Sequence, residues 1–406
     1  MAMKIEDWAD IPAPMESRLL QLPANRAADH LSESVVLRVL LVSTSFPATR
    51  QDWPGRFIAN MAEALARRKD MRLVLWAPPG EHSKIIETAT TPEDAEWLRR
   101  LLGSGGIAHL LRAKPLRGGI AATGLLRRLR RVYQQYRDVD VIHVNWLQNA
   151  LPLWGCDQPA VISVLGNDFG LLRLPGMAAA LRAMLRGRRA MLAPNAEWMG
   201  DELARRFGDL AEIRPIPFGV DDPWFTVERQ RISDVPPLWL AVTRLTRRKI
   251  GDLFAWGEEL FGAQRQLHLF GPMQEALAVP DWVHYHGSTH PKALLEEWFP
   301  RATGLVTLSR HDEGRPQVLL EAMAAGLPVV ASDLPAHRDL IRSGETGALV
   351  DSRPAFAAAL RELEASDVNQ RLGAAARVWI RQTVGTWDDC AARYHAAYRS
   401  VRGANE

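Results

Sequence analysis

Two glutamates, Glu313 and Glu321, lie eight positions apart where a strand-like run gives way to a helix-like run. Pro316 suits the first position of that helix, and Gly326, followed closely by a proline, suits its end. The free amides of a first helical turn, together with the helix dipole, favour a bound anion. We expect such an anion site to be formed by Gly314, Arg315, Pro316, Gln317 and Val318. The two carboxylates could then accept hydrogen bonds from hydroxyl groups at either end of a diphosphate, although two such glutamates can also be unrelated surface residues.

The elements that would position these residues alternate between apolar, strand-like runs and helical or loop segments. The first run covers residues 35–43, and an amphipathic helix is expected over 57–70. Such alternation predicts parallel sheets with helices on both faces. The other strands are expected at 71–78, 138–146, 160–166 and 190–195, and then at 237–245, 266–272, 283–287, 302–309, 328–333 and 347–351.

A polar, proline-containing stretch near residues 222–237 interrupts this alternation and indicates a domain boundary. The sequence therefore predicts an α/β protein with two Rossmann-like, doubly wound domains that face each other across a cleft. Loops at the carboxyl ends of the strands would bind a ligand there. The expected parts are an N-terminal extension (1–34), a first domain (35–222), a linker (223–236), a second domain (237–380) and a C-terminal helix (381–406). That last helix could pack on either domain, including a return to the first.

The bulk composition excludes several classes of protein. With 47% hydrophobic and 24% charged residues the chain resembles an ordinary soluble globular protein. No apolar run approaches the roughly 18 residues of a spanning helix, and the first residues lack the pattern of a signal peptide. The two cysteines, Cys156 and Cys390, show neither a disulfide nor a metal-binding spacing, which favours a reducing compartment. These features predict a cytoplasmic protein.

Positive charge is distributed unevenly, although the net charge is only +3. Two stretches concentrate it, and their basic residues are Arg99, Arg100, Arg112, Lys114, Arg117, Arg127, Arg128, Arg130, Arg131 and Arg137, followed by Arg182, Arg186, Arg188 and Arg189. These side chains could simply be the solvated faces of helices. They could instead contact anionic phospholipid headgroups, where each Lys or Arg adds about 1 kcal/mol. Nucleic acid is not expected as a partner, because aromatic residues are not interleaved with the arginines in the way that stacking platforms for bases require.

The string DEGRPQVLLEAMAAGLPVVASD, residues 312–333, resembles the signature of the large retaining glycosyltransferase family 4, which has the GT-B fold. The resemblance is dense over these 22 positions: two glutamates separated by seven residues precede an EAMA–G–PVV–S–D string. It implies that Glu313 contacts hydroxyl groups of the transferred sugar and that Glu321 binds the ribose of the nucleotide.

A second segment, residues 240–251, resembles the part of the family that neutralises the donor diphosphate, with Thr243 and Ile250 as departures. The resemblance implies this role for Arg244 and Lys249, although the neighbouring arginines at 247 and 248 could compete for it. Two cations at a strand end can stabilise a leaving diphosphate without a metal. The resemblance also implies that the nucleotide base lies near Gly271, Pro272, Gly287 and Ser288.

The loop 46–56 occupies the position of the family's glycine-rich loop, and its single glycine is Gly55. The resemblance implies that Gly55 approaches the donor phosphate and that Arg56 adds a phosphate or acceptor contact. The segment PIPFGVDDPWF, residues 215–225, is similar to the one that leads into the family's interdomain linker, with Phe218 in place of asparagine.

One departure concerns catalysis directly. Many family members have a histidine at the end of the strand 160–166, where this chain has Leu165. Asn167 or Asp168 could supply the missing polar contact. His143 and Asn145, at the end of the preceding strand, are further candidates for the acceptor side. A purely structural hydrogen-bonding role suits each of these residues equally well.

The implied reaction is transfer of a hexosyl group from a UDP- or GDP-sugar to a hydroxyl of a glycan or a lipid-linked acceptor, with retention of configuration. It would need neither a metal nor a cofactor. The basic stretches suggest polysaccharide or lipopolysaccharide synthesis by a protein bound peripherally at the inner face of a membrane. The alternatives are a GT-B sugar-nucleotide epimerase, a phosphorylase, and a non-catalytic partner that binds nucleotide sugars.

Overall fold

The structure is a computed structural model that describes residues 36–49, 52–230, 236–311 and 313–403, apart from the side chains of residues 108, 112 and 167. The expected extension (1–34) and residues 231–235 of the expected linker lie outside these ranges. Both sheets described below belong to one compact unit that begins at Val36.

The first sheet has seven strands in the order β3-β2-β1-β4-β5-β6-β7. All of its strand pairs are parallel, as the alternation of strands and helices predicts. The strands are β1 (Leu37–Val42), β2 (Met71–Trp76), β3 (Glu87–Thr88), β4 (Val141–Asn145), β5 (Ala160–Val164), β6 (Ala190–Pro194) and β7 (Glu212–Ile213). Because β1 lies between β2 and β4, the chain reverses its direction of winding at β1, and a crevice opens at the carboxyl ends of these strands.

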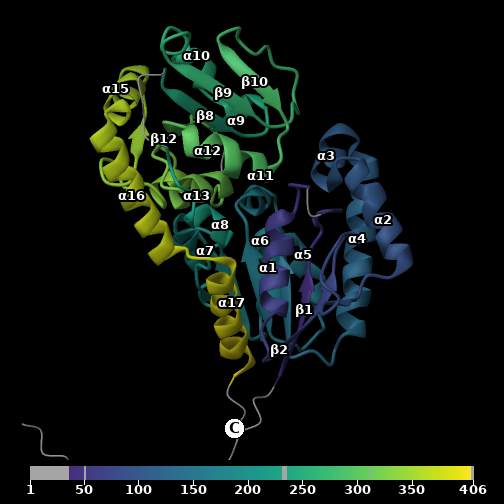
Figure 1. The fold of residues 1–406 in the computed structure, drawn as a ribbon. Coiled ribbons are helices and arrows are strands. Elements are labelled where there is room, and N and C mark those ends of the chain that lie inside the picture. Colours follow the sequence, from purple (N-terminus) through teal and green to yellow (C-terminus); the bar gives the residue numbers. More distant parts are fainter. Residues whose placement is uncertain (1–35, 50–51, 231–235, 312, 404–406) are drawn as a thin grey trace, which may run out of the picture. The chain divides into compact units, whose positions relative to one another are not determined.

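Helices cover both faces of this sheet (Figure 1). One face carries α1 (Arg56–Ala66) and α17 (Trp387–Arg402), which bury the strand residues Val39, Leu41 and Val161. The other face carries α2 (Pro92–Gly103), α4 (Pro115–Gln135), α6 (Met177–Leu185) and α7 (Gly200–Phe207). The shorter elements of this half are α3 (Gly106–Ala113), α5 (Leu147–Ala150), η1 (Leu151–Leu153), η2 (Asn167–Arg173) and η3 (Glu197–Met199).

The second sheet has six parallel strands in the order β10-β9-β8-β11-β12-β13. They are β8 (Leu238–Val242), β9 (Gln266–Phe270), β10 (Val283–Gly287), β11 (Gly304–Thr307), β12 (Val329–Ser332) and β13 (Ala348–Val350). One face packs on α13 (Gln317–Ala324) and α16 (Ser366–Thr383), and the other on α10 (Leu253–Gly257) and α15 (Arg353–Glu364). The remaining elements are α8 (Asp222–Phe225), α9 (Arg247–Ile250), α11 (Pro291–Ala293), η4 (Leu294–Trp298), α12 (Phe299–Arg301) and α14 (Pro335–Arg338).

The local boundaries differ slightly from the sequence expectations. Helix α1 ends at Ala66 rather than at residue 70, because a tight turn leads directly into β2. Helix α13 begins at Gln317, and Pro316 precedes it in an extended conformation instead of occupying its first turn. Gly326 follows the helix with a positive φ of 69°, as a helix end of this kind requires.

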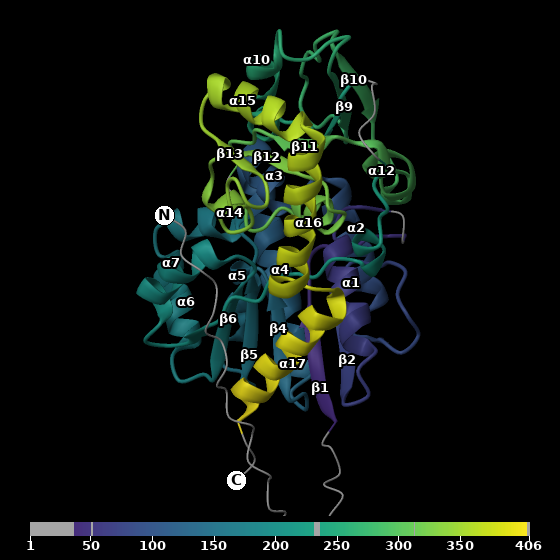
Figure 2. The ribbon, with the colours of Figure 1, turned by 60° about the vertical axis from the view of Figure 1, so that its left-hand side comes forward.

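The C-terminal helix returns to the first sheet. Figure 2 shows α16 beside the second sheet and α17 lying across the strands of the first. Thr386 caps α17, and the amide N–H of Val220 donates to the carbonyl of Gly385 (3.1 Å), so the two chain segments that connect the halves lie together. The sequence left open which half this helix would join, and the structure answers that it is the first.

The basic stretch around residues 99–137 forms α2, α3 and α4. Among the described residues, no helix combines the length and the apolar character needed to cross a bilayer.

Candidate active site

The loops that follow β8 and β11 bring the two predicted donor-site charges into contact. These strands are neighbours at the centre of the second sheet, where its winding reverses. Lys249, on α9 after β8, forms an ion pair with Glu313, in the loop after β11. The two loops are joined by a hydrogen bond from the amide of Arg310 to the carbonyl of Arg248 (2.8 Å). The side chains of Lys249 and Glu313 are only 13% and 17% exposed, so their charges act in a partly desolvated environment.

Burial lowers the pKa of Lys249, while the ion pair with Glu313 raises it and partly compensates. His311 lies near the same pair, and burial followed by repulsion from Lys249 lowers its pKa. His311 is therefore best suited to hydrogen bonding as a neutral imidazole.

Arg244 faces the other half of the protein. Its guanidinium carbon lies 5.8 Å from the ring centroid of Trp53, in the loop between β1 and α1. Gly55, in the same loop, has a φ of 75°, and a Cβ there would lie 2.7 Å from the backbone nitrogen of Phe46. This contact gives Gly55 a structural reason to be glycine that is independent of any phosphate.

Arg56, the first residue of α1, belongs to a charge cluster with Glu321 on α13. Desolvation raises the pKa of Glu321 to about 8; repulsion from Asp221 adds to this shift and attraction to Arg56 opposes it. The pKa of Asp221 is also raised by burial, although the Arg56 charge and a hydrogen bond from Asn60 (3.2 Å) lower it. Within the described residues, the Glu321 carboxyl accepts no hydrogen bond, and the buried Nη1 of Arg56 has no acceptor. The cluster therefore retains unused hydrogen-bonding capacity beside α13.

The loop before α13 packs closely against the first half. A Cβ on Gly166 would lie 2.3 Å from the nitrogen of Gly314, and a Cβ on Gly314 would lie 2.2 Å from Oδ1 of Asn195. Trp198 also donates its indole N–H to the carbonyl of Gly314 (3.1 Å). Gly314 thus permits two chain segments to approach each other, a reason to be glycine that is separate from the anion site expected there.

The residues expected to form the anion site at the start of α13 have different environments in the structure. The amides of Gln317 and Val318 form no hydrogen bond within the described residues and could still bind an anion. The side chain of Gln317 donates to the carbonyl of Gly219 (2.9 Å). The side chain of Arg315 is only 6% exposed and extends toward Asp339, 4.0 Å away, so it packs inside the protein.

The residues expected near the nucleotide base lie at the carboxyl ends of β9 and β10. The amide of Gly271 donates to the carbonyl of Gly287 (2.7 Å), and Leu245 donates to the carbonyl of Pro272 (2.9 Å). These bonds hold the ends of the two strands beside the segment that carries Arg244. Ser288 directly follows Gly287.

The strand ends expected to serve the acceptor are buried instead. The ring nitrogens of His143 contact the hydroxyls of Tyr398 (2.6 Å) and Ser163 (2.8 Å), and Tyr394 contacts Ser163 (2.6 Å). His143 has no exposed surface, and burial lowers its pKa to about 3. Asn145 is equally buried and donates to the carbonyl of Val42 (3.2 Å). An acceptor cannot reach either side chain in this structure, because α17 covers this face of the sheet.

Asp168 also has a structural role. Its carboxyl is 1% exposed and accepts hydrogen bonds from the amides of Leu147 (3.1 Å) and Leu165 (3.0 Å). Burial raises its pKa to about 6, although these two hydrogen bonds lower it. Asp168 thus shapes the loop after β5 from within, while the side chain of Asn167 lies outside the described part of the structure.

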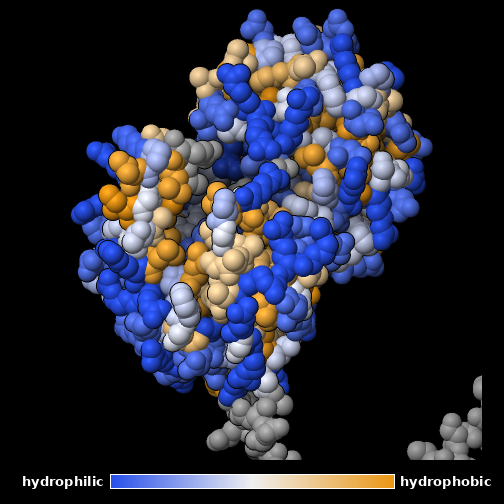
Figure 3. Space-filling view, turned by 180° about the vertical axis from the view of Figure 1, so that it is seen from behind, coloured by the Kyte–Doolittle hydropathy of each residue, from blue (hydrophilic) through white to orange (hydrophobic). Residues whose placement is uncertain are grey.

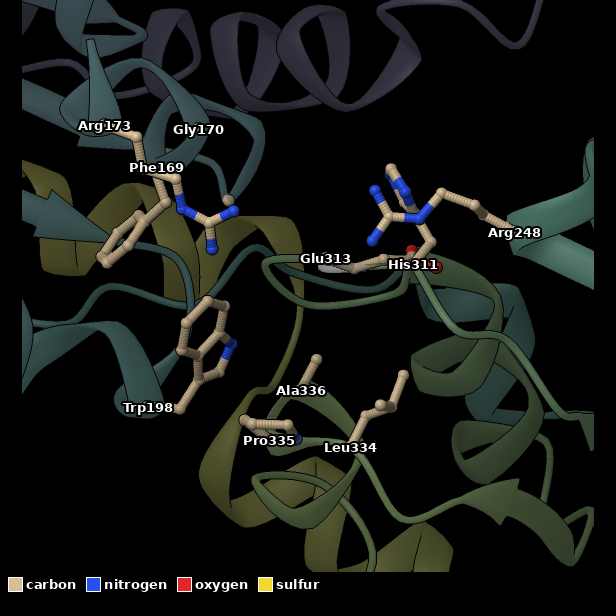
Figure 4. A pocket seen from close by; sticks show the side chains of 11 residues that line it. Phe169, Gly170, Arg173, Trp198, Arg248, His311, Glu313, Leu334, Pro335 and Ala336 are labelled. Carbon is tan, nitrogen blue, oxygen red and sulfur yellow. The ribbon is translucent and has the colours of Figure 1, made fainter. Parts of the chain in front are cut away.

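A pocket of about 260 Å³ opens between the two halves beside Glu313 (Figure 4). Its lining residues are Gly166, Phe169, Gly170, Arg173 and Trp198 from the first half, and Arg248, His311, Glu313, Leu334, Pro335 and Ala336 from the second. In Figure 4, Arg173 and Arg248 extend into the space from opposite sides. Arg173 makes no ion pair with any described residue, and Glu313 is already paired with Lys249, so the pocket suits an anionic group.

Sequence reasoning missed Phe169, Arg173, Trp198 and His311. The first three lie on short turns of η2 and η3, which carry no periodic pattern. His311 stands inside the signature loop, two positions before Glu313, and its proximity in sequence was the one signal available.

Comparisons with known proteins identify relatives of this chain. The profile of the family described as "Glycosyl transferases group 1" matches residues 238–366. A GDP-mannose-dependent alpha-(1-6)-phosphatidylinositol monomannoside mannosyltransferase from Mycobacterium tuberculosis is 25% identical over 396 residues, which cover 88% of this chain and 96% of that protein.

Solved structures show the same fold. Sucrose-phosphate synthase from Thermosynechococcus elongatus superposes with a TM-score of 0.68 at 19% identity, over 91% of this chain and all of that one. Anabaena Alr3699/HepE, in complex with UDP and glucose, gives a TM-score of 0.62 at 13% identity, over 90% of this chain and all of that one.

Proposed function

We propose that this chain, which belongs to the group 1 glycosyltransferases and has their GT-B fold, transfers a hexosyl group from a nucleotide diphosphate sugar to an acceptor hydroxyl with retention of configuration. The observation that carries the proposal is the Lys249–Glu313 ion pair at the centre of the second sheet, beside a pocket shared by both halves. A cation for the leaving group and a carboxylate for the sugar are thereby held together in one partly desolvated place.

The donor would lie along the second sheet. Arg244, Lys249 and the free amides of Gln317 and Val318 would bind its diphosphate. The unpartnered carboxyl of Glu321 would accept hydrogen bonds from the ribose hydroxyls, and the base would lie near Gly271, Pro272, Gly287 and Ser288. GDP-mannose is the first donor to test, because the mannosyltransferase relative uses it. UDP-glucose is the second, because UDP and glucose are bound in a protein of the same fold.

The reaction would proceed on one face of the sugar. The bond between the anomeric carbon and the diphosphate oxygen breaks, and the acceptor oxygen forms the new bond from the same side. The acceptor proton passes to the departing phosphate oxygen. Lys249 and Arg244 would stabilise the growing negative charge on the diphosphate, so this chain's own residues supply the electrostatic stabilisation without a protein nucleophile. Glu313 would hold hydroxyl groups of the sugar while it keeps Lys249 in position.

The acceptor would enter the pocket from the first half. Phe169 and Trp198 offer ring surfaces there, and Arg173 makes no ion pair with any described residue. These groups suit a glycan that carries a phosphate, as a lipid-linked sugar does. The mannosyltransferase relative acts on a phosphatidylinositol monomannoside, which supports a lipid-linked acceptor for this chain. Such an acceptor would fit the synthesis of bacterial polysaccharide or lipopolysaccharide. The enzyme would then work on the cytoplasmic side of a membrane.

A non-catalytic protein that binds nucleotide sugars is the second candidate. Leu165 replaces the expected histidine, and Asp168 is buried in the loop where it could have served as a substitute. A sugar-nucleotide epimerase on the same fold would convert the donor without releasing nucleoside diphosphate.

The test measures nucleoside diphosphate release from GDP-mannose and from UDP-glucose, each incubated with the purified chain. We expect release with one donor, and a loss of at least about a hundredfold in Glu313→Gln and in Lys249→Met. The matched control is Glu296→Gln. Glu296 also pairs with a lysine, Lys292 (3.8 Å), but it is exposed and lies on η4. Binding of a donor without any release would support the non-catalytic candidate, and an altered sugar without release would support the epimerase.

A further inference from the structure

The helices α3 and α4, with their flanking turns, form a surface without any carboxylate. Residues 104–137 contain no Asp or Glu. Their basic residues are Arg112, Lys114, Arg117, Arg127, Arg128, Arg130, Arg131 and Arg137. A stretch of this length with one sign of charge attracts an anionic surface and repels a cationic one.

Most of this charge is not used inside the protein. Arg128 is the exception, because it pairs with Glu93 and Asp94 (3.0 Å each) and stacks on Trp97. In contrast, Lys114, Arg117, Arg127 and Arg131 are exposed and make no ion pair with any residue that the structure describes. Their full charge is therefore available to a partner.

An apolar tip lies beside these cations. Leu116 and Ile120, in the first two turns of α4, are 86% and 74% exposed, and Leu111 at the end of α3 is 41% exposed. An apolar patch is visible over this part of the molecule at the left of Figure 3. Gly118 keeps the tip compact, because a Cβ there would lie 2.6 Å from the Cα of Leu111 and would separate the two helices.

The exposed face of α4 is ordered along the helix axis. Leu116, Ile120, Arg127 and Arg131 are spaced by four, seven and four residues, which places them on one face at 3.6 residues per turn. The opposite face, with Leu125, Leu129 and Val132, is buried against the sheet. Ile120 and Arg127 are about 10 Å apart along the axis. The apolar residues of this face therefore lie at the start of α4, and its two arginines lie farther along the helix.

The tip lies at the same edge of the first sheet as the pocket. The last residue of α4 is followed closely by the start of β4, so the first turn of α4 must lie at the carboxyl edge of the sheet. The pocket residues Gly166 and Arg173 follow the carboxyl end of β5 at this edge. Figure 1 agrees, with α3 at the end of α4 that is farther from the start of β1.

We propose that the α3–α4 tip (Leu111, Leu116 and Ile120) inserts into the interfacial layer of an anionic phospholipid bilayer. Lys114 and Arg117 would lie beside the phosphates at the tip, and Arg127 and Arg131 would be attracted to the anionic surface from farther along α4. The charge of this surface and its exposed apolar residues fit a bilayer better than a protein partner. A protein surface usually carries charges of both signs, whereas this surface offers only positive charge. The membrane attachment stands on these observations alone. Its role in presenting a lipid-linked acceptor to the pocket rests on the proposed function.

The experiment is flotation of the full chain with vesicles of phosphatidylcholine alone and of phosphatidylcholine mixed with phosphatidylglycerol. We expect flotation with the mixed vesicles and its loss at high salt, because each cation contributes about fivefold to the partition constant and is screened by ions. Leu116→Glu/Ile120→Glu and Arg127→Glu/Arg131→Glu should each reduce the partition constant at least tenfold. The controls, Val378→Glu and Arg361→Glu/Arg371→Glu, change other exposed residues on α15 and α16 and should float like the wild type.

The outcomes separate the two proposals. Flotation of both tip variants at the wild-type level, or failure of the wild type to float, would overturn the membrane proposal and point to a protein partner. Equal thermal unfolding temperatures for the tip and control variants verify that the fold is intact. Nucleoside diphosphate release into water should be unchanged in the tip variants. If vesicles bind and no donor is ever turned over, the proposed function fails while the membrane proposal stands.

Discussion

Glu321 offers a direct quantitative test of how the donor is bound. In the free protein its pKa is about 8, because its carboxyl is desolvated and lies near Asp221. At pH 7 about nine-tenths of the molecules would therefore carry a protonated Glu321. A ribose that donates hydrogen bonds to this carboxyl favours its ionised form and lowers its pKa. Binding of a nucleotide sugar at pH 7 should then release about 0.9 proton per site.

The affinity should depend on pH for the same reason. If the ionised form binds, the apparent dissociation constant at pH 7 is about elevenfold larger than at high pH, and at pH 6 it is about a hundredfold larger. Even a pKa one unit lower would leave a release of about half a proton at pH 7. A nucleotide sugar is the right ligand for this measurement, because its diphosphate has no titrating group in this range.

The assay is calorimetric titration with GDP-mannose or UDP-glucose at pH 7 in two buffers of different ionisation enthalpy. The difference between the two apparent enthalpies gives the number of protons released. Glu321→Gln is the matched variant, since it keeps the shape of the side chain and cannot titrate. Asp221→Asn should lower the pKa of Glu321 and so reduce the release. The reasoning is refuted if the wild type and Glu321→Gln release equal numbers of protons.

Three further predictions follow from the geometry. Gly166→Ala should destabilise the protein by about 1–3 kcal/mol, because Gly166 has a φ of 92° and a Cβ there would meet Gly314. Gly170→Ala is the control, since a Cβ on Gly170 would meet open space. Equal midpoints of urea unfolding for the two variants would contradict the prediction. Acidification from pH 6.5 to 4 should destabilise the β9–β10 edge. Burial and the neighbouring His284 and His286 lower the pKa of His268 to about 4, so the unfolded chain binds more protons than the folded chain in this range. His268→Asn should therefore flatten the dependence of the unfolding temperature on pH. Tyr398→Phe should lower the free energy of unfolding by about 1–3 kcal/mol, because Nδ1 of the buried His143 loses its hydrogen-bond partner. Tyr136→Phe, at a part-buried position, should lower it by less. The reverse order in denaturant unfolding would argue against a stabilising role for the His143–Tyr398 hydrogen bond.

The sheets could be predicted from the sequence because their strands are continuous apolar runs. Each such run can be recognised without knowing which strands lie beside it. β8, for example, is recognisable from Trp239, Leu240 and Ala241 alone, which are all buried. The signature string, residues 312–333, also carried enough information to single out Glu313 and Glu321 as candidates. Each partner of the central ion pair was predicted, but their contact depends on the adjacency of β8 and β11, which only the fold establishes.

The acceptor side could not be predicted in the same way. His143 stands at the end of a strand and carries a group capable of chemistry, so the sequence left both an acceptor-side role and a structural role open for it. Its environment is set by Tyr394 and Tyr398, more than 200 residues later in the chain, and these cover it completely. Conversely, Arg173 and Trp198 have no neighbours in sequence that mark them as functional, and only the close approach of the two halves places them in a pocket.

The return of α17 to the first sheet also determines the order in which the protein can be completed during synthesis. Every strand of the first sheet leaves the ribosome long before α17 does, and the second sheet emerges in between. Until then, the sheet face that contains Val39, Leu41 and Val161 lacks the layer formed by Trp387, Tyr394 and Tyr398. The half that is translated first is thus the last to acquire its full core, and a nascent chain must keep this face from aggregating while the other half folds.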